Sequence, residues 1–147
     1  MNHCNHDDCA YKRKSWLKGT KDLDLHTDEL RSYLRRGIDL DWSGHVTDRE
    51  IKRKITSIES TEALLNGECI WYATIQNDTR GKTHHWIWMG YSKIGKAQYR
   101  PLHLVLSAPY TTNIERVSVL TVYDPSISPW MWNKTFDIKL CWHKQRL

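Results

Sequence analysis

The order of sequence periods predicts an α+β fold, in which two helices pack on one face of a four- to five-stranded, mainly antiparallel sheet. Apolar residues at helical spacing occupy the chain before Gly67, and runs rich in β-branched and aromatic residues follow it. The chain has 147 residues, enough for one domain with a sizeable core. We therefore expect a single domain over residues 27–147, preceded by an arm of residues 1–26.

The predicted arm mixes charged runs with isolated apolar residues and shows no sustained period, so we expect it to be partly ordered at best. It begins with four residues of metal-ligating types, His3, Cys4, His6 and Cys9. Structural zinc sites usually take their ligands as two close pairs on separate turns, whereas these four crowd together. We expect a flexible tail and assign no metal ligand and no cofactor. The alternative is a zinc site that also uses Cys141 and His143.

Two helices are expected before Gly67. Thr27 can cap the first, which ends at Gly37 and whose apolar residues share one face: Leu30, Tyr33 and Leu34. The second begins with the capping box "TDRE" at residues 47–50 and continues with Ile51, Ile55 and Ile58 at helical spacing. The sequence "STEALLNG" at residues 60–67 either continues this helix or adds a turn.

Four strands are expected at residues 68–76, 84–91, 101–107 and 116–124. Their short connections predict an antiparallel meander. The sequence "FDIKLCW" at residues 136–142 is a candidate fifth strand at the sheet edge. With both helices on one face, we expect the other face of the sheet to be free to bind.

His103 is the unexpected residue of the third predicted strand, because it stands between Leu102 and Leu104. Strand parity separates the leucines from the histidine, so the imidazole points to the open face if the leucines meet the helices. Arg100 and Tyr123 can then flank it. The alternative is a half-buried histidine that is hydrogen-bonded to a neighbouring side chain.

The sequence "MGYSKIGKAQYRPLHLVLS", followed by "VSVLTVYDPSISPW", resembles the prokaryotic domain-of-unknown-function family 4258, and "RRGI" at residues 35–38 extends the likeness more weakly. That family is placed among the RelE-like, barnase-related ribonuclease folds, and its genes often look like toxins beside antitoxin genes. The resemblance implies a RelE-like fold. The family-like positions in this chain are Arg36, His103, Tyr123, Pro125 and Trp130.

Together with the basic net charge, the resemblance implies a metal-independent RNA endonuclease, the toxin of a toxin–antitoxin pair, with RNA and an antitoxin protein as partners. Such an enzyme must deprotonate the ribose 2′-OH, stabilise the phosphorane and protonate the leaving oxygen. His103 is the candidate general acid or base, and Arg100 and Arg36 are candidate phosphate clamps. Tyr123 can donate to the phosphate or stack on a base.

Further residues could bind RNA. The net charge of +5 favours an acidic partner. Trp86 and Trp88 share one strand face and offer stacking surfaces, although such a stripe is more often core. Trp130 lies in a Trp-rich loop, and the basic C-terminal tail offers His143, Lys144 and Arg146, unless it is simply a solvated tail.

Other classes of function are disfavoured. The chain has no P-loop, Gly-rich dinucleotide turn, serine elbow or "HExxH" pair. It also lacks an apolar segment long enough to span a bilayer and a signal-peptide core, so we expect a cytoplasmic protein whose cysteines are thiols. The rival hypothesis is a non-catalytic RNA- or protein-binding module of a phage or mobile element, which uses Trp130 and Trp132 as anchors of a Trp-rich surface.

Overall fold

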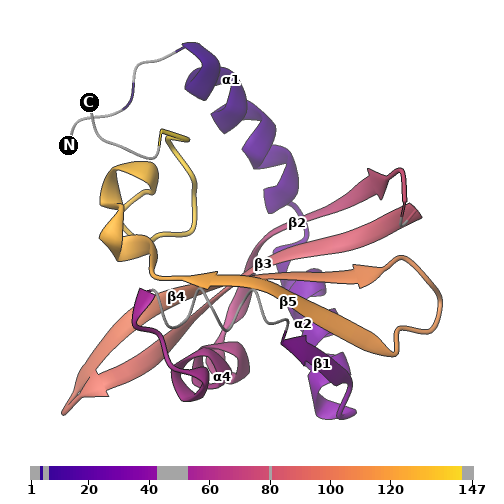
Figure 1. Ribbon diagram of the computed structural model, residues 1–147. Coiled ribbons are helices and arrows are strands. Elements are labelled where there is room, and N and C mark those ends of the chain that lie inside the picture. The colour runs from indigo at the N-terminus through magenta and orange to yellow at the C-terminus, as the bar shows by residue number, and fades with distance from the viewer. Residues whose placement is uncertain (1–3, 5–6, 43–52, 80, 144–147) are drawn as a thin grey trace.

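The computed structural model describes residue 4 and residues 7–42, 53–79 and 81–143. Figure 1 shows the arrangement of these elements. The helices are α1 (Asp7–Trp16), α2 (Leu23–Arg35) and α4 (Ser57–Asn66), with 3-10 turns η1 (Leu17–Thr20), η2 (Pro125–Ile127) and η3 (Pro129–Met131). The strands are β1 (Asp39–Trp42), β2 (Glu68–Asn77), β3 (Gly81–Gly95), β4 (Gln98–Pro109) and β5 (Arg116–Tyr123). The chain is therefore an α+β protein.

The five strands form one mixed sheet in the order β1-β5-β4-β3-β2. Strands β2 to β5 pair antiparallel with their sequence neighbours, so the predicted meander is confirmed. The fifth strand is β1, which pairs parallel with β5. Residues 136–142 are not a strand, because this segment makes a single isolated bridge between Trp132 and Lys139.

Helices α2 and α4 cover one face of the sheet, as expected. Leu102, Leu104 and Leu106 of β4 are fully buried against them, together with Leu30 of α2 and Leu64 of α4. This first core also holds the two indole rings at positions 86 and 88 of β3. The leucine stripe of the sequence therefore identifies the helix-covered face correctly.

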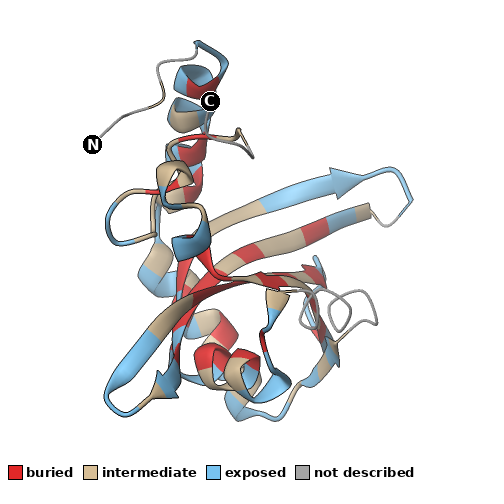
Figure 2. Cartoon of the chain, turned by 60° about the vertical axis from the view of Figure 1, so that its left-hand side comes forward, coloured by how far each residue is buried: buried red, intermediate tan, exposed pale blue. Residues whose placement is uncertain are grey.

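The opposite face of the sheet is covered as well, and the expectation of a free binding face is wrong. The end of α1 and the segment of residues 124–143, here called the C-terminal segment, pack on this face (Figure 1). Their second core buries Trp16, Ile70, Met89 and Trp132. Figure 2 shows buried residues on the central strands and on both flanking layers. No simple period marks the C-terminal segment, because it turns twice through 3-10 helices.

The N-terminal region is more ordered than its composition predicts. Helix α1 and turn η1 occupy residues 7–20, inside the expected arm, and Trp16 anchors them in the second core. Helix α2 is confirmed but begins at Leu23, four residues before Thr27. It ends before Gly37, whose φ of 73° lets the chain reverse into β1.

Helix α4 lies where the sequence left two possibilities open. The capping box at residues 47–50 lies outside the described residues. A capping box does start α4: the Thr56 hydroxyl accepts from the backbone N–H of Glu59, and the Glu59 carboxylate accepts from that of Thr56. Lys54 has a φ of 57° and precedes this start, so Ile55 and Ile58 do not share one continuous helix. Among the described residues, no helix has both the length and the apolar composition to cross a bilayer.

Candidate functional site

His103 lies on the face that parity predicts, but it is fully buried there. Its Nε2 atom lies 2.7 Å from the carbonyl oxygen of Phe136, and its Nδ1 atom lies 3.2 Å from the hydroxyl of Tyr123. The ring of Trp132 packs edge-on against the imidazole at 4.4 Å between centroids. The expectation that this imidazole faces an open surface is wrong, because the C-terminal segment closes over it.

These two contacts define the protonation state of His103. A carbonyl oxygen can only accept, so Nε2 carries the hydrogen that is donated to Phe136. In the neutral ring Nδ1 then accepts from the Tyr123 hydroxyl. Burial lowers the pKa of His103 to about 3 and raises the pKa of Tyr123. At neutral pH both ring nitrogens are occupied and the imidazole is uncharged, so it acts as a structural link between the sheet and the C-terminal segment.

Acid should therefore destabilise the fold through His103. An unfolded imidazole binds a proton near pH 6.5, whereas the folded ring stays neutral until about pH 3. Below about pH 6.5 the unfolded state binds more protons than the folded state, so the free energy of unfolding falls by up to about 1.4 kcal/mol per pH unit as the pH drops. Above that pH both states hold a neutral imidazole, and His103 makes its full contribution to stability. The charged or titratable groups facing the ring are Tyr123, Asp137 and Lys139.

Urea unfolding of the wild type and of His103→Gln across this pH window would measure the effect. The other acid-sensitive groups contribute equally to both proteins, so their contributions cancel in the difference between the two free energies of unfolding. We expect the wild type to lose its stability advantage over the variant as the pH falls. A difference that is constant with pH would contradict the assignment.

The two predicted phosphate clamps, Arg100 and Arg36, do not lie beside His103. Arg100 lies at a position of opposite parity on β4, on the helix side, where its guanidinium pairs with Glu59 at 2.9 Å and approaches Asp124 at 4.0 Å. Two carboxylates thus offset the charge that a phosphate clamp needs. Arg36 is exposed at the end of α2, over the ring of Tyr33. Of the four predicted catalytic residues, only His103 and Tyr123 are in contact in the structure.

The predicted stacking residues are also placed differently. Trp86 and Trp88 pair in register with leucines of β4 and are fully buried in the first core, so their role as exposed stacking surfaces is wrong. Trp130 is half-buried, and its indole N–H donates to the carbonyl of His143 at 3.0 Å. It therefore secures the end of the C-terminal segment. Lys144 and Arg146 lie outside the described residues.

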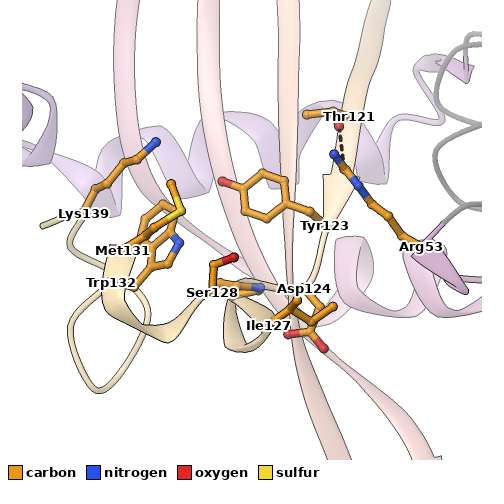
Figure 3. A pocket seen from close by; sticks show the side chains of 10 residues that line it. Arg53, Thr121, Tyr123, Asp124, Ile127, Ser128, Met131, Trp132 and Lys139 are labelled. Atoms are coloured by element: carbon orange, nitrogen blue, oxygen red, sulfur yellow. Dashed lines mark hydrogen bonds between the residues drawn. The ribbon is translucent and has the colours of Figure 1, made fainter. Parts of the chain in front are cut away.

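A pocket of about 480 Å³ opens beside Tyr123, between the end of β5 and the C-terminal segment (Figure 3). It combines two cationic side chains with aromatic and apolar walls. Its lining residues are Arg53, Thr121, Tyr123, Asp124, Pro125, Ile127, Ser128, Met131, Trp132 and Lys139. No pattern in the sequence singled out Arg53 or Lys139, because they come from segments that the fold brings together.

Both pocket cations are held in place by neighbours. The Nη1 group of Arg53 donates to the carbonyl of Val122 at 2.6 Å and to the hydroxyl of Thr121 at 3.2 Å. The ammonium group of Lys139 lies 5.6 Å from the ring centre of Trp132. Burial and nearby Lys12 lower the pKa of Lys139, since both disfavour its positive charge.

Further lysines lie on the same side of the sheet, outside the pocket lining. Helix α1 and turn η1 lie above this face with the C-terminal segment (Figure 1). Their exposed lysines are Lys12, Lys14 and Lys18. The acidic lining residue, Asp124, is already engaged, because it accepts from the backbone and hydroxyl of Ser126.

Three cysteines and a histidine also converge in the structure. The Sγ atoms of Cys4, Cys9 and Cys141 and a ring nitrogen of His143 all lie within 4.8 Å of one another. The four cysteines of the chain are thiols, as expected. The structure thus brings together four of the six residues of the zinc alternative. The other two, His3 and His6, lie outside the described residues.

Comparisons of this chain with protein-family models, curated proteins and solved structures find no match. The resemblance to family 4258 and its RelE-like fold stay predictions. The functional argument therefore depends on the pocket and on the residues around it.

Proposed function

We propose that this protein is a non-catalytic RNA-binding module that takes a nucleotide of a single strand in the pocket beside Tyr123. The observation that carries the proposal is the pairing of Arg53 and Lys139 with aromatic walls in one cavity. Single-stranded RNA presents the complementary chemistry, because each nucleotide joins an anionic phosphate to a flat base.

The two kinds of lining suggest how a nucleotide would lie. A phosphate at one of the two cations would accept charge-assisted hydrogen bonds, while the base would rest on the apolar wall that includes Met131 and Ile127. Ile127 is 64 % exposed, so this wall is open to a ligand. The hydroxyl of Tyr123 is directed into the same space (Figure 3).

Electrostatic attraction over a longer range supports an RNA ligand. Helix α1 and turn η1, on the side of the sheet that the C-terminal segment covers, carry the exposed Lys12, Lys14 and Lys18. With a net charge of +5, this surface would attract the phosphates that flank the bound nucleotide. Binding should therefore weaken as salt rises.

Ribonuclease activity and the antitoxin partner stay predictions of the family resemblance. The cytoplasmic location stays a prediction from composition. The structure favours binding over cleavage because both ring nitrogens of His103 are occupied by protein groups. A cleaving enzyme would need a proton-transfer group other than this imidazole.

RNA binding can be tested by fluorescence anisotropy with labelled single-stranded RNA of mixed sequence. Lys139→Gln should weaken binding by about tenfold, the size expected for one lost charge-assisted contact. Ile127→Asp should weaken it further, since this exposed position would place a carboxylate at the pocket mouth. Lys96→Gln is the matched control, because this exposed lysine lies in the turn between β3 and β4, outside the pocket.

Equal affinities of Lys139→Gln and Lys96→Gln would contradict the pocket as the binding site. The same samples, run on a denaturing gel, test the non-catalytic part of the proposal. We expect intact RNA from the wild type, and specific cleavage that purified wild type performs would overturn that part.

A further inference from the structure

We propose that Cys4, Cys9, Cys141 and His143 form a structural zinc site that joins the two ends of the described chain. The Nδ1 atom of His143 lies 3.7, 3.5 and 3.3 Å from the Sγ atoms of Cys4, Cys9 and Cys141, respectively. The four ligand atoms form a compact group around one point.

These separations fit the edges of a zinc tetrahedron. With Zn–S near 2.3 Å and Zn–N near 2.0–2.1 Å, tetrahedral angles put sulfur and nitrogen ligands about 3.6 Å apart. The three measured distances fall on both sides of this value. Three thiolates and one imidazole are a ligand set typical of structural zinc, and four protein ligands leave no open position for catalysis.

The surroundings of the cluster are those of a metal-binding histidine. While Nδ1 of His143 faces the thiols, its Nε2 atom lies 4.0 Å from the carboxylate of Asp8. A carboxylate on the far ring nitrogen is the common way to orient an imidazole ligand. The backbone N–H of His143 also donates to the Sγ atom of Cys141 at 3.4 Å, which stabilises a thiolate there.

Two cations lie close to the segments that carry the ligands. Zinc with three thiolates carries a net charge of −1. Lys139 interacts electrostatically with Cys9 and Cys141. The guanidinium of Arg13 donates to the carbonyls of Cys4 at 3.0 Å and Leu140 at 2.8 Å, so it ties together the segments that carry the ligands.

A metal would also explain why α1 is held against the protein. This ten-residue helix buries only Cys9 and Trp16, and a polar helix of this length is marginal by itself. Without a metal, three thiols and an imidazole would share only weak hydrogen bonds. Zinc would add a stronger attachment to the anchoring by Trp16 and would fix the C-terminal segment over His103.

The test is the metal content of the full chain, purified under reducing conditions and measured by plasma mass spectrometry. We expect about one zinc per chain. Cys9→Ser and Cys141→Ser should lose most of it, while Cys69→Ala, the matched control, should retain it because Cys69 lies in the first core. Replacement of zinc by Co²⁺ should give thiolate-to-cobalt charge-transfer bands and the intense visible bands of a tetrahedral site.

The wild type decides the question even if the serine variants fail to fold. Wild type without bound zinc, both as purified and after reconstitution with zinc, would overturn the proposal, as would a cobalt spectrum without thiolate bands. Folded Cys9→Ser and Cys141→Ser with full zinc content would also overturn it. If the protein binds only copper when it is offered equal concentrations of zinc and copper(I), the site exists but its assignment to zinc is wrong.

Discussion

Replacing His103 by alanine should lower the free energy of unfolding by about 3–5 kcal/mol, because the change opens a cavity and leaves two buried polar groups unpaired. The carbonyl of Phe136 would lose its donor, and the hydroxyl of Tyr123 would lose its acceptor. The ring contact with Trp132 would also disappear. Urea unfolding at neutral pH, followed by tryptophan fluorescence, measures the loss.

Two conservative variants separate this structural role from a catalytic one. His103→Gln keeps an N–H donor near the position of Nε2 and should recover part of the lost stability, whereas His103→Asn places its amide near Nδ1 and should recover less. Neither variant should alter RNA binding at the pocket while it is folded. If the wild type cleaves RNA and the His103→Gln variant is folded but does not, a purely structural role of His103 is contradicted. Equal stability of His103→Ala and the wild type would contradict it too.

Gly90→Ala should destabilise the protein by about 3 kcal/mol or more, because helix α4 packs directly on the backbone at this position. A Cβ atom at Gly90 would collide with the carbonyl oxygen of Ala63 and lie 2.7 Å from its Cα atom. Both are backbone atoms of a buried helix residue, so no side-chain rotation relieves the contact. Strand β3 and α4 would have to separate, which would also loosen the leucines of the first core.

Gly95→Ala is the control for this prediction. It adds the same methyl group to the same strand, but its nearest neighbour is the flexible side-chain oxygen of Gln98 at 3.2 Å. We expect this variant to stay within about 1 kcal/mol of the wild type. Thermal or urea unfolding of both variants gives the comparison. Similar losses for the two glycines would show that the close approach of α4 does not limit stability.

The helix-covered half of the protein was predictable from local patterns. Leu102, Leu104 and Leu106 alternate with polar or smaller residues, and this period of two places them on one face whatever the rest of the chain does. The same rule places Arg100 opposite His103, because the two positions differ by an odd number. Their failure to meet could therefore have been expected from the sequence, once residue 100 is known to belong to the strand.

The other half depends on contacts that no local pattern encodes. Phe136 reaches His103 because its backbone adopts a φ of 62° inside a turn, which hydrogen bonds between Asn133 and Asp137 hold in place. The sequence of this Pro-broken loop has no period that would predict such a turn. Strand β1 is also hard to recognise, since it has only four residues and takes its partner from the distant strand β5. The sequence showed residues of metal-ligating types near both ends of the chain, but it did not show that the fold would bring them together.

The meeting of Cys4 and Cys9 with Cys141 and His143 has a consequence for biosynthesis. Residues 4 and 143 are the first and the last that the structure describes, so no contact between described residues has a larger sequence separation. His143 must emerge from the ribosome before these four residues can meet. Until then, a nascent chain can bury its leucines beneath α2 and α4, while the residues of the second core stay accessible to chaperones.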